Sequence, residues 1–309
     1  MARPSPTGPM ISLRGGPAEW VEASDPSAVA RARRVGDRLA EAAGIDASRR
    51  PEWSIAVTEA ASNVVRHGER GAVVLSARPG AVELWALDHG PGIADVRWSL
   101  ADGSTTSGSA GLGLGAIQRQ SDVFAVHAER GRGTVLYAGI GADPDLSGVV
   151  LACPGASASG DGWSFVRSGS EVSALVFDGL GHGPAAARAA ETALSAFEAS
   201  APADPAALLR GVGEALHAER GGVGSVVSLA DGGAASFAGV GNVDARVVGM
   251  ELGEQRLLPS PGTLGGRLRS LASSPLEAPV SPVYVLATDG IRARWRAREL
   301  SGVWGRPVG

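Results

Sequence analysis

Lysine is absent from this chain of 309 residues, and arginine supplies all 28 of its basic side chains. That absence excludes a phosphate-binding loop ending in Gly-Lys-Ser or Gly-Lys-Thr, and it excludes the strand lysine of eukaryotic-type protein kinases. A single cysteine, Cys153, excludes an intrachain disulfide and a cysteine-rich zinc site. The net charge of -4 provides no electrostatic case for binding nucleic acid.

Long hydrophobic runs are missing as well. No segment approaches the length of a membrane span, and residues 1–13 hold too short an apolar stretch for a signal peptide. Hydrophobic residues still make up 44% of the chain, which is enough for a core, and the length suits two domains of common size. We therefore expect a soluble, cytoplasmic protein with no membrane or nucleic-acid partner.

The first candidate site lies on a predicted helix over residues 51–67. Glu59 and Asn63 stand one helical turn apart on one side of it. An amide oxygen is a hard ligand for Mg²⁺, and a carboxylate beside it can take a proton or hold a water. Gly68 suits the left-handed residue that ends a helix. Taken alone, the pattern also fits an ordinary amphipathic helix with a solvated polar side.

A predicted strand over residues 82–87 runs into the turn Asp88-His-Gly90-Pro-Gly92. The carboxylate at the strand end can accept a hydrogen bond from the exocyclic amine of adenine, where guanine has a carbonyl instead. The two glycines let the backbone approach a ligand closely. The motif by itself also fits a plain turn.

A glycine-rich run, Gly111-Leu-Gly113-Leu-Gly115, leads into a predicted helix. Its backbone N–H groups suit a phosphate cradle at a helix N-terminus. It follows a loop and not a strand, so it is not a dinucleotide fingerprint.

Four motifs in fixed order resemble the ATP-binding fold of the GHKL superfamily: Glu59…Asn63, Asp88-X-Gly-X-Gly, the glycine-rich run and Gly133-Thr134. The superfamily includes gyrase, Hsp90, the histidine kinases and the anti-sigma-factor serine kinases. Because no dimerisation helix with a phosphoacceptor histidine precedes the motifs, the chain is most similar to the serine kinases of the RsbT type. The resemblance covers about residues 10–140 and implies a Bergerat-type α/β sandwich.

The resemblance also implies roles for single residues. Glu59 would position or deprotonate the attacking hydroxyl as the catalytic residue, and Asn63 would hold Mg²⁺. The implied ATP-binding residues are Asp88 at the adenine amine with Thr134 beside it, Gly90 and Gly92 along the base pocket, and Gly111, Gly113 and Gly115 at the phosphates, under a lid over residues 96–110.

The turn-rich segment 141–148 is the best domain boundary and predicts domains over residues 1–142 and 147–309. In the second domain Asp161, Asp178 and Asp289 each lie beside glycine at or near a predicted strand end. Such aspartates, with an accessible glycine carbonyl, make a site for hard cations. Two cations bridged by carboxylates can lower the pKa of a shared water and clamp a phosphoryl group. Each Asp-Gly pair separately fits a β-turn.

Four elements of the second domain resemble the SpoIIE-type branch of the metal-dependent serine/threonine phosphatases, in its compact RsbX form: Gly160-Asp161, Asp178-Gly-X-Gly-His-Gly, Gly239-Val-Gly-Asn242 and Thr288-Asp289-Gly290. The resemblance covers about residues 147–300 and implies an α-β-β-α sandwich. The implied ligands of Mn²⁺ or Mg²⁺ are Asp161, Asp178, the Gly179 carbonyl and Asp289, with Asp178 as the catalytic residue. Two departures, no acid at 163–165 and an arginine-rich segment at 292–298, leave the number of metals and the level of activity open.

Together the resemblances imply an α+β protein with two activities. It would phosphorylate and dephosphorylate serine or threonine on STAS-domain anti-sigma antagonists or stressosome proteins, and so control a stress or sigma-factor response. Two alternatives stay open. The chain could be an ATP-dependent binding module that sequesters a regulatory partner, with a weak phosphatase attached. The ATP site could instead regulate the phosphatase without transferring phosphate.

Overall fold

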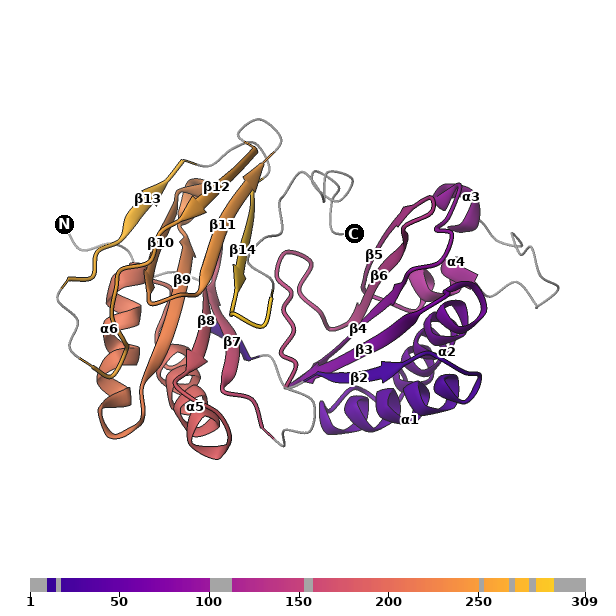
Figure 1. Cartoon of the computed structure of the whole chain (residues 1–309), viewed down its shortest axis with the longest axis horizontal. Coiled ribbons are helices and arrows are strands. Elements are labelled where there is room, and N and C mark those ends of the chain that lie inside the picture. The colour runs from indigo at the N-terminus through magenta and orange to yellow at the C-terminus, as the bar shows by residue number, and fades with distance from the viewer. Residues whose placement is uncertain are drawn as a thin grey trace. The chain divides into compact units, whose positions relative to one another are not determined.

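The computed structural model describes residues 10–14, 18–100, 113–152, 158–249, 253–266, 270–277 and 282–291. The chain divides into two compact units; in Figure 1 one is drawn in indigo to magenta, and the other is drawn mostly in pink to yellow but includes the indigo residues 10–14. The N-terminal unit spans residues 16–151, and the C-terminal unit combines residues 1–15 with residues 152–306. Among the described residues, no helix has both the length and the apolar character needed to cross a bilayer.

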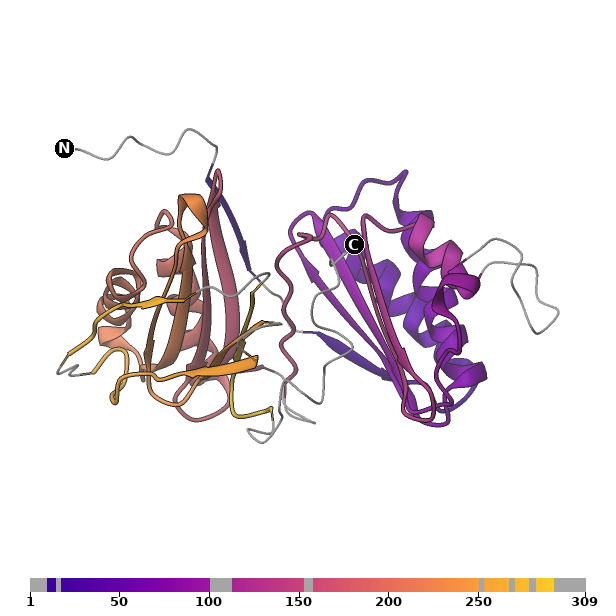
Figure 2. The same cartoon turned by 90° about the horizontal axis from the view of Figure 1, so that it is seen from above.

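The N-terminal unit is a five-stranded antiparallel sheet with helices on one face (Figure 2). Its strands, in the spatial order β2-β3-β4-β6-β5, are β2 (Glu19–Glu22), β3 (Gly71–Arg78), β4 (Ala81–Asp88), β6 (Gly133–Ile140) and β5 (Val123–Glu129). Its helices are α1 (Ser27–Ala42), α2 (Arg50–His67), α3 (Val96–Leu100) and α4 (Gly113–Arg119). This is the α/β sandwich that the GHKL resemblance implies.

Local sequence explains the main turns and contacts of this unit. The hairpin between β3 and β4 turns at Pro79-Gly80, where Gly80 has the positive φ of 76° that glycine adopts without strain. Helices α1 and α2 approach closely at Gly36, where a Cβ atom would lie 3.0 Å from a methyl group of Val57. The fully buried indole of Trp53 donates to the Gly36 carbonyl at 3.0 Å, which satisfies its one polar atom.

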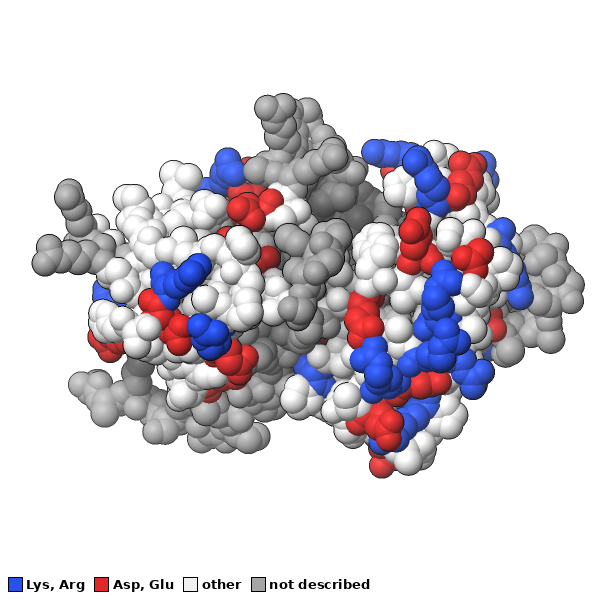
Figure 3. Space-filling view, turned by 60° about the horizontal axis from the view of Figure 1, so that its bottom comes forward, with Lys and Arg blue, Asp and Glu red and all other residues white. Residues whose placement is uncertain are grey.

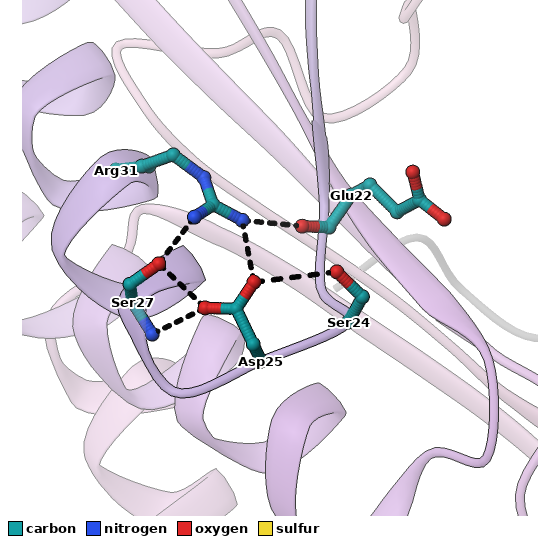
Figure 4. A network of polar contacts seen from close by, with 5 residues as sticks. All are labelled: Glu22, Ser24, Asp25, Ser27 and Arg31. Carbon is teal, nitrogen blue, oxygen red and sulfur yellow. Dashed lines mark hydrogen bonds and ion pairs between the residues drawn. The ribbon is translucent and has the colours of Figure 1, made fainter.

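Helix α1 begins at a polar network drawn in Figure 4. The Asp25 carboxylate accepts from the backbone N–H of Ser27 at 2.7 Å and from the Ser27 hydroxyl, and so satisfies a donor at the helix start. The Arg31 guanidinium bonds the same carboxylate at 3.4 Å and the Glu22 carbonyl at 3.2 Å, and so ties the helix to β2. The Ser27 hydrogen bonds, followed by Arg31, lower the pKa of Asp25 to about 2.

Acidic and basic side chains are interspersed on the face of the N-terminal unit seen in Figure 3. Many of them form exposed ion pairs, such as Arg38 with Glu19 and Arg33 with Asp37. Basic side chains form a band over the unit in that view, and acidic side chains lie beside it.

The C-terminal unit stacks two antiparallel sheets. The larger has the order β1-β7-β8-β9-β10-β13, with β1 (Met10–Arg14), β7 (Asp161–Ser168), β8 (Glu171–Gly179), β9 (Gly222–Leu229), β10 (Ala235–Val240) and β13 (Ser274–Leu276). The smaller has the order β12-β11-β14, with β12 (Gly253–Leu257), β11 (Asp244–Gly249) and β14 (Val283–Ala287). The helices are α5 (Pro184–Glu198) and α6 (Pro205–Ala215), followed by the 3-10 turns η1 (Leu216–Ala218) and η2 (Asp231–Gly233).

Two apolar clusters hold these layers together. One joins α5 and α6 to the larger sheet and includes Phe177 and Phe197, and the other lies between the sheets around Phe237 and Val247. The described residues thus form an α-β-β arrangement (Figure 2). The second helical layer of the expected α-β-β-α sandwich is not among the residues that the structure describes.

Strand β1 pairs antiparallel with β7, from Met10 opposite Ser168 to Arg14 opposite Ser164. The expected division at residue 142 differs from the structure here, because the first strand belongs to the C-terminal unit. The chain then enters the N-terminal unit at Ala18, whose N–H donates to the Val150 carbonyl at 2.7 Å where the chain leaves it. Periodicity predicts a strand at residues 10–13 but carries no information about its partner.

Deletion of residues 1–15 tests this pairing. We expect the C-terminal unit to unfold several degrees lower, because the edge of β7 loses its hydrogen-bonded neighbour and 1 kcal/mol shifts the midpoint by roughly 2–4 °C in a domain of this size. The N-terminal unit should keep its midpoint. Calorimetric unfolding of the full chain and the deletion measures both, and an unchanged midpoint for the C-terminal unit would contradict the pairing.

Candidate functional site

The polar pair on α2 faces a cavity of about 380 Å³ in the N-terminal unit. Glu59, Asn63, Asp88 and Thr134 all line it, so residues from one helix and two strands meet there. The volume lies at the lower end of the range for small-molecule sites. The cavity therefore brings together four of the residues expected to serve one nucleotide.

Asp88 is the last residue of β4, at the centre of the sheet. In register it pairs with Gly71 on β3 and with Thr134 on β6. One oxygen of its carboxylate accepts from the backbone N–H of Gly90 at 2.8 Å, which fixes the side chain in the turn. The other oxygen has no hydrogen-bond partner in the described part of the chain, and so it is available to a ligand.

Glycines bring backbone directly against this aspartate. A Cβ atom on Gly133 would lie 1.9 Å from the Asp88 carbonyl oxygen, and one on Gly90 would lie 2.3 Å from the His67 carbonyl oxygen. Gly68 follows the same rule, since a Cβ there would lie 2.6 Å from the Cβ of Asp88. The expected left-handed cap at Gly68 is wrong: its φ is -87° and its ψ is 128°. Close packing, and not a positive φ, explains glycine at that position.

The remaining predicted glycines have different surroundings. Gly92 lines the cavity with a φ of 71°, and a Cβ on it would lie 2.3 Å from the Glu129 carbonyl oxygen. Gly113 lines the cavity with open space around it. Gly115 is buried against α3 and does not line the cavity; a Cβ on it would lie 2.7 Å from the Leu100 carbonyl oxygen. Gly111 and most of the expected lid lie outside the described residues.

The surroundings of Glu59 change its affinity for a proton. Burial raises the pKa of Glu59, and the positive charge of Arg66 partly opposes that rise. A carboxylate with a raised pKa is a stronger base than a solvated one. Glu59 can therefore take a proton from a hydroxyl group brought into the cavity.

The motifs assign no role to several of the lining residues. The larger apolar ones include Ile93, Trp98, Leu114 and Leu136, and they offer a surface to a flat base. Arg66 and His67 line the cavity too, three and four residues after Asn63. Helical spacing predicts His67 on the side of the helix that carries Glu59 and Asn63, and the same rule places Arg66 one turn after Asn63.

The second candidate site lies in the C-terminal unit, where two strands of one hairpin place Asp161 directly opposite Asp178. An antiparallel hairpin sets the start of β7 beside the end of β8, so the two aspartates meet although 17 positions separate them. Asp289 follows β14 of the smaller sheet, and its charge acts on both. The three predicted aspartates therefore come together where the two sheets meet.

These carboxylates repel one another. Burial raises the pKa of Asp178 to about 6, and the charges of Asp161 and Asp289 add to the shift. Burial and Asp289 raise the pKa of Asp161 as well, while the Thr288 hydroxyl donates to Asp161 and opposes the rise. Within the described ranges, no three His, Cys, Asp or Glu side chains are already close enough together to ligate one cation.

The donor set nevertheless suits a hard divalent cation. All of its groups are oxygens, and a cation relieves the repulsion that raises these pKa values. The Gly179 carbonyl oxygen lies beside Gly160, since a Cβ on Gly160 would be 3.3 Å from it. Glycine is required at position 179 itself, where a Cβ would lie 2.7 Å from the Ala186 carbonyl oxygen of α5.

Residues 23–140 match the model of the histidine kinase-like ATPase domain. The chain is 30% identical over 114 residues to the serine/threonine-protein kinase RsbT of Bacillus subtilis (strain 168), which covers 36% of this chain and 86% of that protein. The chain belongs to the histidine kinase-like ATPase family. The N-terminal unit is accordingly called the ATPase unit below.

Solved structures similar to the chain include phosphatases. A crystal structure of RsbX in complex with magnesium is 22% identical with a TM-score of 0.43, over 46% of this chain and 71% of that one. The PP2C phosphatase domain of SpoIIE from Bacillus subtilis is 16% identical with a TM-score of 0.38, over 69% of this chain and 62% of that one.

Replacement of Asp88 by asparagine tests the nucleotide site. We expect ATP affinity to fall about 30- to 150-fold, because the lost charge-assisted hydrogen bond to the adenine amine is worth about 2–3 kcal/mol. Isothermal calorimetry of ATP with Mg²⁺ measures the change. Asp95→Asn is the matched control, because Asp95 lines the same cavity but accepts the Trp98 N–H instead. Unchanged affinity in folded Asp88→Asn would overturn the adenine contact.

Proposed function

We propose that the ATPase unit is a protein serine/threonine kinase and that the C-terminal unit is a metal-dependent protein serine/threonine phosphatase. The observation that carries the kinase assignment is the cavity that Asp88, Glu59 and Asn63 line together. Burial raises the pKa of Glu59 there. The similarity to RsbT, named a serine/threonine-protein kinase, spans 86% of that protein and supports the same activity.

In this kinase, Asp88 accepts from the adenine amine and Thr134 stands beside it on the neighbouring strand. Gly90, Gly92 and Gly113 let the backbone approach the base and the phosphates closely, and Gly111 and Gly115 complete the glycine-rich run. Asn63 offers its amide oxygen to Mg²⁺, which neutralises phosphate charge when bound. Glu59 holds the hydroxyl group of the protein substrate and takes its proton.

In the phosphatase, Asp161, Asp178, Asp289 and the Gly179 carbonyl hold Mg²⁺ or Mn²⁺, with Asp178 at the centre of the cluster. The observation that carries this half is that the hairpin sets Asp161 opposite Asp178 and that burial, followed by the charge of Asp289, raises the pKa of Asp161, while burial and the charges of Asp161 and Asp289 raise the pKa of Asp178. Divalent cations at such a site supply an activated water and clamp the phosphoryl group. The protein holds the three carboxylates near one another. No side chain attacks the phosphoryl group, so no covalent phosphoenzyme forms.

The substrates of both units are STAS-domain anti-sigma antagonists or stressosome proteins, as the resemblance to the RsbT type of kinase supports. The pair of activities makes the chain a partner-switching regulator of a stress or sigma-factor response in the cytoplasm. Transfer of labelled γ-phosphate from ATP to a STAS protein tests the first half. Binding of the STAS protein without transfer would favour sequestration, and ATP-dependent phosphate release without transfer would favour a regulated phosphatase.

Glu59→Gln should retain ATP binding and lose at least about 100-fold in transfer rate, because general-base catalysis contributes about 10²–10⁴-fold. Asn63→Ala should instead weaken ATP binding in the presence of Mg²⁺. Because burial raises the pKa of Glu59, the wild-type rate should fall as the pH drops through a midpoint above the ordinary glutamate value. Glu59→Gln should lack that acid limb. Transfer by Glu59→Gln at the wild-type rate would exclude its role as base.

Asp178→Asn should abolish phosphate release from a phosphorylated STAS protein, and EDTA should do the same to the wild type. In EDTA the variant should unfold at the same temperature as the wild type or higher, because a carboxylate with a raised pKa destabilises the fold above that pKa. Thermal unfolding and a phosphate-release assay measure the two effects. Activity that survives either treatment would show that these aspartates form ordinary turns.

A further inference from the structure

Strands β8 and β9 stay paired beyond the end of β8. The last pair in register is Gly179 with Gly222. The next N–H along β8, that of Leu180, donates to the Gly221 carbonyl at 3.1 Å. Because the chains are antiparallel, one further step brings Gly181 opposite the residue that precedes Gly221.

That residue is Arg220. A Cβ atom on Gly181 would lie 3.2 Å from the Nη1 of Arg220, so the guanidinium lies directly against the turn that follows Asp178. Gly181 has a φ of 88°, and the absence of a side chain there leaves room for the guanidinium. An arginine 42 positions after Asp178 is thereby placed against Gly181, the third residue after that aspartate.

The backbone beside Arg220 is held on two sides. Leu180 bonds Gly221 from one side, and Leu264 bonds Gly222 from the other through N–H to carbonyl contacts of 3.1 and 2.8 Å. Gly221 has a φ of 75°, and a Cβ on it would lie 2.3 Å from the Leu264 carbonyl oxygen. The base of the Arg220 side chain therefore has a fixed position relative to the turn.

The guanidinium is not used by the protein itself. Arg220 is exposed, and its side chain has no hydrogen bond or ion pair within the part of the chain that the structure describes. The charges that act on Asp178 are those of Asp161 and Asp289, and Arg220 is not among them. The arginine therefore leaves the carboxylates unneutralised and its own N–H groups unpaired.

We propose that Arg220 binds the phosphoryl group of the substrate, a phosphate monoester, at the rim of the carboxylate cluster. Its paired N–H donors match two oxygens of a phosphate, and its charge attracts a dianion into a site otherwise lined by three carboxylates. The inference rests on the proposed phosphatase function for its substrate. The motif residues supply the cation site, and Arg220 supplies the contact to the anion.

The experiment compares wild type, Arg220→Ala, Arg220→Lys and Arg34→Ala in the full chain with Mg²⁺ or Mn²⁺. Arg34 is the matched control, because it is also an exposed arginine without a partner among the described residues, but in the ATPase unit. The probes are p-nitrophenyl phosphate for turnover and inorganic phosphate for inhibition and for calorimetric binding. Circular dichroism verifies that each variant is folded.

We expect Arg220→Ala to raise KM and the inhibition constant of phosphate at least about 10-fold, in the range of lost hydrogen bonds to charged groups. The turnover number should change much less. Arg220→Lys should be intermediate, because lysine keeps the charge but not the paired donors. Arg34→Ala should match the wild type.

Unchanged KM and phosphate inhibition in folded Arg220→Ala would overturn the inference. So would a loss of turnover alone, which would indicate that Arg220 only supports the turn. A wild type without cation-dependent hydrolysis would count against the proposed phosphatase, and calorimetry would then decide the inference separately. Phosphate binding that Arg220→Ala loses would support it, and binding that is absent from the wild type or equal in both would overturn it.

Discussion

Contact between backbone segments around Asp88 is the constraint on which the ATPase site depends. The end of α2, the starts of β3 and β6 and the turn after β4 all approach that residue so closely that a single Cβ would collide with them. A Cβ atom would lie 1.9 Å from the Asp88 carbonyl oxygen at Gly133 and 2.6 Å from the Asp88 Cβ at Gly68. Beside Asp88, it would lie 2.3 Å from the His67 carbonyl oxygen at Gly90 and 2.4 Å from the Leu87 carbonyl oxygen at Gly71. Glycine at those positions replaces side-chain packing by direct backbone contact. The helix with the polar pair and the strand with the aspartate therefore have little freedom to shift relative to each other, which suits a site that must position reacting groups.

In the C-terminal unit the candidate site places carboxylates near one another, and their negative charges repel. The register of the β7–β8 hairpin sets Asp161 opposite Asp178. Cross-strand pairs of like charge are unfavourable, and here the hydrogen bonds and apolar packing of the sandwich outweigh that cost.

Chemistry was easier to predict from the sequence than spatial neighbours were. The strands that end at or beside Asp88 and Asp178 and the helix that carries Asn63 form close to the predicted bounds, and the ligands proposed for these residues follow from donor type and from the family resemblances. The conformation of Gly68 was not predictable, because its glycine answers a contact with Asp88 that lies 20 positions away. The burial of Gly115 was not predictable either, because it depends on a contact with the Leu100 carbonyl of α3.

Tertiary contacts also explain what no motif indicates. The apolar walls of the cavity come from four separate segments, and only the fold brings Leu114 and Leu136 together. Arg220 belongs to no motif, and its place beside the turn after Asp178 depends on the pairing of β8 with β9. The five residues of β1 likewise do not indicate that its partner is β7. Local sequence determines elements and donors, whereas register determines which of them meet.

The pairing of β1 makes the ATPase unit an insertion between two parts of the C-terminal unit. The hydrogen bond from Ala18 to Val150 joins the two ends of the inserted unit. Once that unit has folded, its ends are already close together, so pairing β1 with β7 closes a shorter effective loop and costs less chain entropy. On the ribosome, β1 emerges first and has to wait for β7 until the whole ATPase unit has been synthesised. At about 5–20 residues per second that delay is roughly seven to thirty seconds, long compared with the folding of a small domain. The ATPase unit can therefore complete its sheet first, and the C-terminal unit closes its own only afterwards.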